Sequence, residues 1–96
     1  MKIIVKGYFN LQKAMEGKSL VEMEKGTASL REVLRELCDR FGKDLTELIY
    51  PSEAEEPAGR LIVLVNGRNY LSMPDRLETR LKDGDEIALF PPLAGG

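Results

Sequence analysis

Residues 29–41 read SLREVLRELCDRF, and this stretch decides how the chain folds. Its apolar side chains recur at the spacing of one helix face: they are Leu30, Val33, Leu34, Leu37, Cys38 and Phe41. Ser29 and Glu32 form an S-x-x-E capping box, in which each side chain accepts a hydrogen bond from the other residue's backbone N–H. Gly42 stands where a left-handed C-terminal cap would end the helix. The pattern predicts an amphipathic helix that has to cover an apolar layer elsewhere in the chain.

The segments around this helix carry the pattern of β-strands; they are residues 2–6, 19–24, 61–65, 68–71 and 86–90. The first two alternate between apolar and polar residues, as half-buried strands do. The third is apolar at every position, which predicts contacts on both of its faces. Asn66-Gly67 supplies the two-residue turn of a hairpin between the third and fourth. Residues 8–17 predict a turn with a short helical piece, and residues 45–49 predict a further helical turn before Pro51.

The order of these elements is strand, strand, helix, strand, short strand, strand. A chain of this order buries its helix when the helix lies diagonally across one face of a mixed sheet. We therefore expect an α+β fold of the β-grasp type, with four to five strands packed on one main helix. The first and last strands would pair in parallel at the centre of the sheet, through a right-handed crossover.

The outer face of this sheet is the first candidate for a functional surface. Within residues 86–90, Ala88 and Phe90 would face outward beside Ile4, because alternate strand residues point to opposite faces. The third strand would extend this face through Ile62 and Leu64, or through Val63 and Val65. A register shift of one residue would instead place Phe90 in the core. Since an exposed apolar patch marks a protein contact, Phe90, Ala88 and Ile4 are predicted to bind a partner.

The composition excludes several classes of function. The 96 residues carry a formal net charge of -2, with no histidine and one cysteine. Without histidine the chain has no Ser-His-Asp or Cys-His catalysis, and a net negative charge argues against nucleic acid as a partner. No apolar run approaches the ~20 residues of a membrane span. Because residues 1–6 also lack the pattern of a secretion signal, we expect a cytoplasmic protein.

The end of the chain is the second candidate; it reads Phe90, Pro91, Pro92, Leu93, Ala94, Gly95, Gly96. The two prolines stiffen the exit from the last strand, and the two glycines leave the terminal carboxylate free of bulky neighbours. We expect a domain over residues 1–92 and a flexible tail over residues 93–96. Such a tail can enter the active site of a partner that holds ATP and magnesium, where the carboxylate becomes an acyl-adenylate.

Together, the β-grasp order, the Asn66-Gly67 turn, the stretch LKDGDEIALFPP and the terminal glycines resemble a known family. They are similar to the ubiquitin-like sulfur carriers of the MoaD/ThiS type, and most like the small subunit of molybdopterin synthase. The resemblance implies that Gly96, with Gly95, is adenylated by a ubiquitin-activating-like adenylyltransferase and converted to a thiocarboxylate. It further implies that a sulfur donor system supplies the sulfur, and that a large subunit receives it for molybdopterin synthesis. Residues 90–94 would contact these partners, and the chain itself would be no enzyme and bind no cofactor.

Two other functions fit the same sequence: a ubiquitin-like modifier joined to lysines through Gly96, and a noncovalent β-grasp adaptor. The acidic loop over residues 51–59 is longer than in compact carriers, and either alters partner choice or decorates the surface. Its carboxylates at Glu53, Glu55 and Glu56 are expected to be solvated rather than to bind a metal. Cys38 lies in the apolar helix stripe, so we expect a core residue with no chemistry.

Overall fold

The computed structural model describes residues 1–92. Its strands are β1 (Lys2–Gly7), β2 (Leu20–Glu24), β3 (Ile62–Val65), β4 (Arg68–Asn69) and β5 (Glu86–Phe90). Its α-helices are α1 (Asn10–Ala14), α2 (Leu30–Phe41) and α3 (Lys43–Ile49). Three short 3-10 turns, η1 (Pro51–Glu53), η2 (Tyr70–Ser72) and η3 (Arg76–Glu78), complete the described part. Leu93, Ala94, Gly95 and Gly96, which carry the tail prediction, lie outside it.

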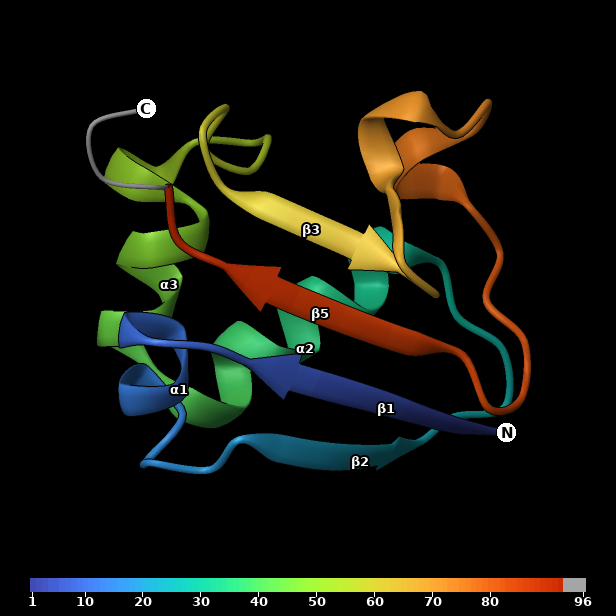
Figure 1. The fold of residues 1–96 in the computed structure, drawn as a ribbon, viewed down its shortest axis with the longest axis horizontal. Helices are drawn as coiled ribbons and strands as arrows, with labels where there is room; N and C mark the ends of the chain where they lie inside the picture. The colour runs from blue at the N-terminus through green and yellow to red at the C-terminus, as the bar shows by residue number, and fades with distance from the viewer. Residues whose placement is uncertain (93–96) are drawn as a thin grey trace.

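The five strands form one mixed sheet in the order β2-β1-β5-β3-β4. β1 and β5 pair in parallel, and the other neighbouring strands pair antiparallel. Figure 1 shows the helices on one side of this sheet, with α2 crossing behind it and α1 and α3 near the end at which β5 finishes. The arrangement confirms the predicted α+β β-grasp fold and its parallel central pair. None of the helices in residues 1–92 has the length and apolarity needed to cross a membrane.

Helix α2 forms as its sequence predicts. The Ser29 Oγ accepts from the Glu32 backbone N–H at 3.2 Å, and the Glu32 carboxylate accepts from the Ser29 backbone N–H at 3.1 Å. Five of the six predicted stripe residues are buried, and Phe41 is partly buried. Gly42 has the expected positive φ of 89°, but its ψ of -155° is not that of a left-handed cap. The extended ψ turns the chain at once into α3, which begins at the next residue.

The core lies between α2 and the inner face of the sheet. Ile3 and Val5 of β1 and Ile87 and Leu89 of β5 are all fully buried, and they belong to the same apolar cluster as Leu34 of α2. Burial of one such side chain contributes roughly 1.5–3 kcal/mol relative to an exposed one, so the contact between the two central strands and α2 is a large part of what stabilises the fold.

The register of β3 decides which residues face outward. Asn66 and Gly67 both have positive φ, 52° and 84°, as the hairpin turn requires. In β3, which precedes this turn, Ile62 pairs with Phe90 and Leu64 pairs with Ala88 of β5. Ile62 and Leu64 are half-buried on the outer face, whereas their neighbours on the strand are buried. The prediction that β3 is contacted on both faces is therefore wrong for the described chain: its outer side chains belong to the open face of the sheet.

The predicted place of Ile4 needs a correction as well. Ile4 lies on the outer face, but it pairs with Glu86, and Lys6 pairs with Ala88. The Ile4 backbone N–H donates to the Asp85 carbonyl at 3.0 Å, and the Tyr8 backbone N–H donates to the Leu89 carbonyl at 3.1 Å. This parallel register places Lys6, and not Ile4, beside Ala88.

Candidate functional site

The outer face is built around an aromatic pair at the end of the central strands. The rings of Tyr8 and Phe90 are stacked, with centroids 4.2 Å apart and planes within 4° of each other. Phe90 is half-buried, and Tyr8 is 36% exposed. Phe90 therefore faces outward, as predicted, and the alternative register with Phe90 in the core does not occur.

Two shallow hollows flank this pair. A hollow of about 450 Å³ lies over β1, β5 and β3; it is lined by Lys6, Tyr8, Leu64, Asn66, Gly67, Glu86, Ala88 and Phe90. A second hollow of about 260 Å³ lies toward the edge strand, lined by Lys6, Tyr8, Ser19 and Leu20. Lys6 and Tyr8 line both, so they form the ridge between them. The face also carries a Lys2–Glu22 ion pair on its edge strands. The two hollows themselves offer apolar side chains with one charged group between them, and such a surface suits a protein partner.

That charged group is an ion pair. The Lys6 Nζ lies 2.7 Å from the Glu86 carboxylate, and both side chains are partly exposed. The hydrogen bond to Glu86 raises the pKa of Lys6 above its ordinary value, so the lysine stays charged throughout the physiological range. A partner that covers the hollow meets a neutralised pair rather than an isolated charge, which lowers the desolvation cost of docking.

The exit of the tail lies next to the stacked rings. Pro91, which is half-buried, and Pro92, which is exposed, follow Phe90 without belonging to a strand. Among the predicted partner-binding residues, the structure brings Ala88, Phe90, Pro91 and Pro92 together at this end of the sheet. Ile4 shares the face but lies nearer its middle, opposite Glu86. The position of the predicted reactive group at Gly96 is not described.

Sequence reasoning missed Lys6, Tyr8 and Leu20 as parts of this surface. The signal was present, because the outward alternation of β1 continues from Lys2 through Ile4 and Lys6 to Tyr8. β1 ends at Gly7, one residue beyond the predicted range of 2–6, and Tyr8 follows it directly. A Cβ on Gly7 would lie 2.6 Å from the Met15 Sδ, so the glycine serves the close approach of α1.

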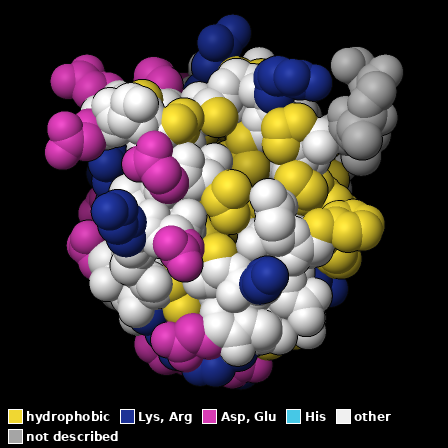
Figure 2. All heavy atoms as spheres, turned by 90° about the vertical axis from the view of Figure 1, so that its left-hand side faces the viewer, with side chains coloured by type: hydrophobic (Ala, Val, Ile, Leu, Met, Phe, Trp, Pro, Cys, Tyr) yellow, Lys and Arg dark blue, Asp and Glu magenta, His cyan; other side chains and the backbone are white. Residues whose placement is uncertain are grey.

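Figure 2 views the end of the molecule at which α1 and α3 lie. Hydrophobic side chains gather along one side of this end, and most acidic side chains lie on the other side and at its lower edge. Exposed apolar residues identified near the end of β1 are Tyr8 and Phe9, with Leu20 at the start of β2. The apolar character of the outer sheet face therefore continues around the end of the sheet.

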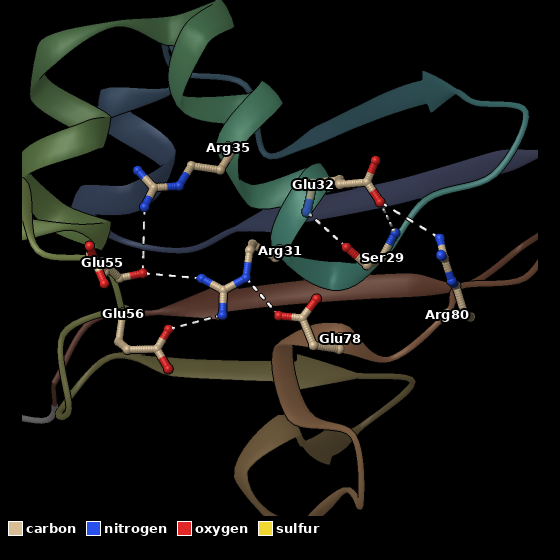
Figure 3. A network of polar contacts seen from close by, with 8 residues as sticks. All are labelled: Ser29, Arg31, Glu32, Arg35, Glu55, Glu56, Glu78 and Arg80. Carbon is tan, nitrogen blue, oxygen red and sulfur yellow. Dashed lines mark hydrogen bonds and ion pairs between the residues drawn. The ribbon is translucent and has the colours of Figure 1, made fainter.

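The other sequence candidates have structural roles. Cys38 is 5% exposed, and burial raises the pKa of its thiol, which keeps it protonated and inert as predicted. The acidic loop is tied down by Arg31 of α2 (Figure 3). Arg31 contacts the Glu78 carboxylate at 2.8 Å, the Glu56 carboxylate at 3.2 Å and the Glu55 carbonyl at 3.2 Å. These contacts hold part of the loop against the helix side of the molecule.

Comparisons with known proteins agree with this fold. A model of the ThiS family matches residues 7–96. Small archaeal modifier protein 3 of Haloferax volcanii is 29% identical over 96 residues, which is all of both chains. A protein assigned as a sulfur carrier in Archaeoglobus fulgidus is 29% identical over 76 residues, 79% of this chain and 83% of the other.

The solved small archaeal modifier protein 1 of Methanosarcina acetivorans has a similar structure. Its TM-score is 0.83 at 31% identity, and the likeness covers 99% of this chain and 96% of the other. These relatives are carriers or modifiers rather than enzymes. The match over nearly the whole sequence, together with the β-grasp sheet and the glycine-ended tail, shows that this chain belongs to the ThiS family of ubiquitin-like sulfur carriers and modifiers.

Proposed function

We propose that the chain is a sulfur carrier that delivers sulfur from its Gly96 carboxyl group in molybdopterin synthesis, as the small subunit of molybdopterin synthase. The observation that carries the proposal is the outer face, where Tyr8 and Phe90 stack beside the point at which the chain leaves the sheet. A partner that docks there meets the start of the segment ending in Gly95 and Gly96.

The chemistry takes place in two steps on a partner enzyme. A Gly96 carboxylate oxygen attacks the α-phosphorus of ATP, and the bond from that phosphorus to the bridging oxygen breaks and releases pyrophosphate. Hydrosulfide, supplied by a sulfur donor system, then attacks the acyl carbon and expels AMP, which leaves a thiocarboxylate. Magnesium belongs to the ATP of the adenylyltransferase, so this chain contributes the acceptor oxygen and a docking surface. The proposal places these steps in the cytoplasm, where ATP is available.

The sulfur would then be delivered to the second partner, the large subunit. In the active site of the large subunit, the thiocarboxylate sulfur would attack a carbon of a pterin precursor and displace an oxygen substituent from it. Water would then hydrolyse the resulting thioester, which leaves the sulfur on the pterin and releases the Gly96 carboxylate. The adenylyltransferase and the large subunit bind at different stages, so the same apolar outer face can serve as the docking surface for both.

Covalent protein modification is the second candidate, and the likeness to small archaeal modifier proteins favours it. It shares the adenylate but ends differently: a lysine amine attacks the acyl carbon and expels AMP, which forms an isopeptide bond. A noncovalent adaptor, the third possibility in the sequence, would need neither glycine.

One experiment separates these candidates. The chain is incubated with the adenylyltransferase of its source organism, ATP, magnesium and sulfide, and its intact mass is measured. Sulfur carriage predicts the gain of one sulfur in place of one oxygen, and no gain in the variant that lacks Gly95 and Gly96. Absence of the gain in the full chain would count against sulfur carriage.

The modifier is tested in cells. A tryptic digest of the source organism would show lysines that carry residues 83–96 of this chain, because Lys82 is its last basic residue, and these adducts would disappear when the gene is deleted. The adaptor predicts that the variant without the two glycines still complements such a deletion. Loss of complementation rejects the adaptor.

A further inference from the structure

Phe9 adopts a backbone conformation that a phenylalanine rarely takes. Its φ is 56° and its ψ is -124°, and the Leu11 backbone N–H donates to the Tyr8 carbonyl at 3.1 Å. These values and this bond are those of a type II′ turn with Phe9 at its first central position. Glycine dominates that position because a Cβ is strained at positive φ.

Packing inside the molecule does not explain the strain. Phe9 is 74% exposed, the most exposed of the large hydrophobic residues identified in the described chain. It precedes α1 without capping the helix through its side chain. A glycine would serve this turn better, and a polar residue would suit the solvent better. The ring is therefore suited to a contact outside its own chain.

The position of Phe9 shows where that contact is made. Its neighbour Tyr8 stacks on Phe90 and donates its backbone N–H to the carbonyl of Leu89. Leu20, 47% exposed, lies at the start of β2 and lines the smaller hollow together with Tyr8. We call Tyr8, Leu20 and Phe90, together with Phe9 next to Tyr8 in the chain, the tail-end patch. It adjoins the point where the chain leaves the sheet.

The length of the remaining chain restricts what covers this patch. Four residues follow Pro92, and even a fully extended segment of four residues spans at most about 14 Å. An enzyme that reacts with the Gly96 carboxylate must therefore bring its active site within that distance of Pro92. Its surface around the active site then lies against the tail-end patch.

We propose that Phe9 is an anchor residue for the adenylyltransferase, and that it inserts into an apolar pocket beside the enzyme's ATP site. This inference rests on the proposed function and adds a residue that determines recognition. Aromatic side chains at the centre of an interface carry a large share of binding energy. The strained turn holds the ring outward before the partner arrives, so docking does not have to order it.

The test uses the full chain and the adenylyltransferase of the source organism. The rate of ATP–pyrophosphate exchange is measured against carrier concentration for the wild type, Phe9→Gly, Phe9→Ala and a control, Leu71→Ala. Leu71 is 44% exposed and lies in η2, at the end of the sheet opposite to the one at which β5 finishes (Figure 1). Thermal melting of each variant reports on its fold.

Both Phe9 variants are expected to raise the KM for the carrier about tenfold or more, with kcat within about twofold, because the contact is made equally before and during the reaction. Phe9→Gly is also expected to melt at a temperature equal to or above that of the wild type. Leu71→Ala should leave KM unchanged. If Phe9 had only a structural role, Phe9→Gly would not both melt at or above the wild-type temperature and bind the adenylyltransferase more weakly.

Each contrary result is informative. If the wild type supports exchange and the two Phe9 variants keep its KM, the anchor is wrong while the proposed function stands. If the wild type supports no exchange, the proposed function fails and the anchor fails with it. Should Phe9→Gly melt well below the wild type, the ring stabilises the fold, and the assignment of its role to a partner is overturned.

Discussion

The ring of Tyr8 lies 4.2 Å from that of Phe90 in a nearly parallel stack, and this pair joins the ends of the two central strands on the open face of the sheet. The backbone bond from Tyr8 to Leu89 beneath it fixes the register there. The same two rings therefore belong both to the fold and to the surface that a partner meets.

A double-mutant cycle on this pair tests its role in the fold. Tyr8→Ala and Phe90→Ala should each lower the free energy of unfolding, and their coupling should be about 0.5–1.5 kcal/mol, as for other aromatic pairs. Urea denaturation of the wild type, the two single variants and the double variant measures it. Additive losses would show that the rings do not support each other.

The sequence was sufficient to predict the fold because local and long-range signals agree. The capping box at Ser29, the stripe of α2 and the turn at Asn66 each predict an element that the sheet then uses. The outer face was predicted less completely. Alternation assigns residues to a face of a strand, but it does not give the register between parallel strands that are distant in sequence, so Ile4 was placed beside Ala88 where Lys6 lies.

Phe9 of the site and the structural residue Arg31 had no clear sequence signal. Phe9 occupies a position at which glycine is usual, so the sequence gives no reason to expect a tight turn there. Arg31 is one of the polar residues between the apolar stripe positions of α2, and its sequence position does not indicate a partner. Its three partners come from segments far apart in sequence, and only the folded chain brings them together.

Gly7→Ala tests the close approach of α1 to β1. The added Cβ would meet the Met15 Sδ at 2.6 Å, and Met15 is fully buried. We expect a loss of about 1–3 kcal/mol in the free energy of unfolding, the usual cost of overpacking. Gly59→Ala is the matched control, because its Cβ would meet nothing within 4 Å. Equal stability of the two variants in urea would contradict the steric argument.

The capping box makes a pH-dependent contribution to stability. Hydrogen bonds from the Ser29 backbone N–H and then from its side chain lower the pKa of the Glu32 carboxyl below its ordinary value. A carboxyl whose pKa is lower in the folded state stabilises the fold above the unfolded pKa, near 4.3, and this contribution is lost as the pH falls through the folded pKa.

Glu32→Gln should therefore destabilise the chain at pH 7, and its difference from the wild type should shrink toward pH 3. Chemical denaturation across that range measures the difference. Asp39→Asn, on the exposed side of the same helix, serves as the control for a general change of charge. A constant difference at all pH values would show that the carboxylate charge does not matter to the cap.

Arg31→Ala should release the acidic loop without unfolding the domain. The guanidinium loses its contacts to Glu56, Glu78 and the Glu55 carbonyl, but exposed ion pairs of this kind stabilise by only about 1 kcal/mol or less (Figure 3). Hydrogen exchange should become faster at the amides of residues 53–58, and it should stay unchanged in the strands. Arg40→Ala, on the same helix, should alter neither. Unchanged exchange in the loop would show that other contacts hold it.

Ala88→Gln tests whether the larger hollow is covered when the adenylyltransferase binds. Ala88 lies on the floor of this hollow between Lys6 and Leu64, its partners on the two neighbouring strands. A glutamine there keeps the net charge, projects from the open face and fills space that a partner would use, so the domain should keep its melting temperature within a few degrees. The KM for the carrier in ATP–pyrophosphate exchange should rise about tenfold, since a polar group left unpaired in an apolar contact is costly. Glu22→Gln, on the outer face of the edge strand β2, is the control and should leave KM unchanged. If Ala88→Gln behaves like this control, the enzyme does not cover the hollow, and its contacts are confined to the end of the sheet near Pro91.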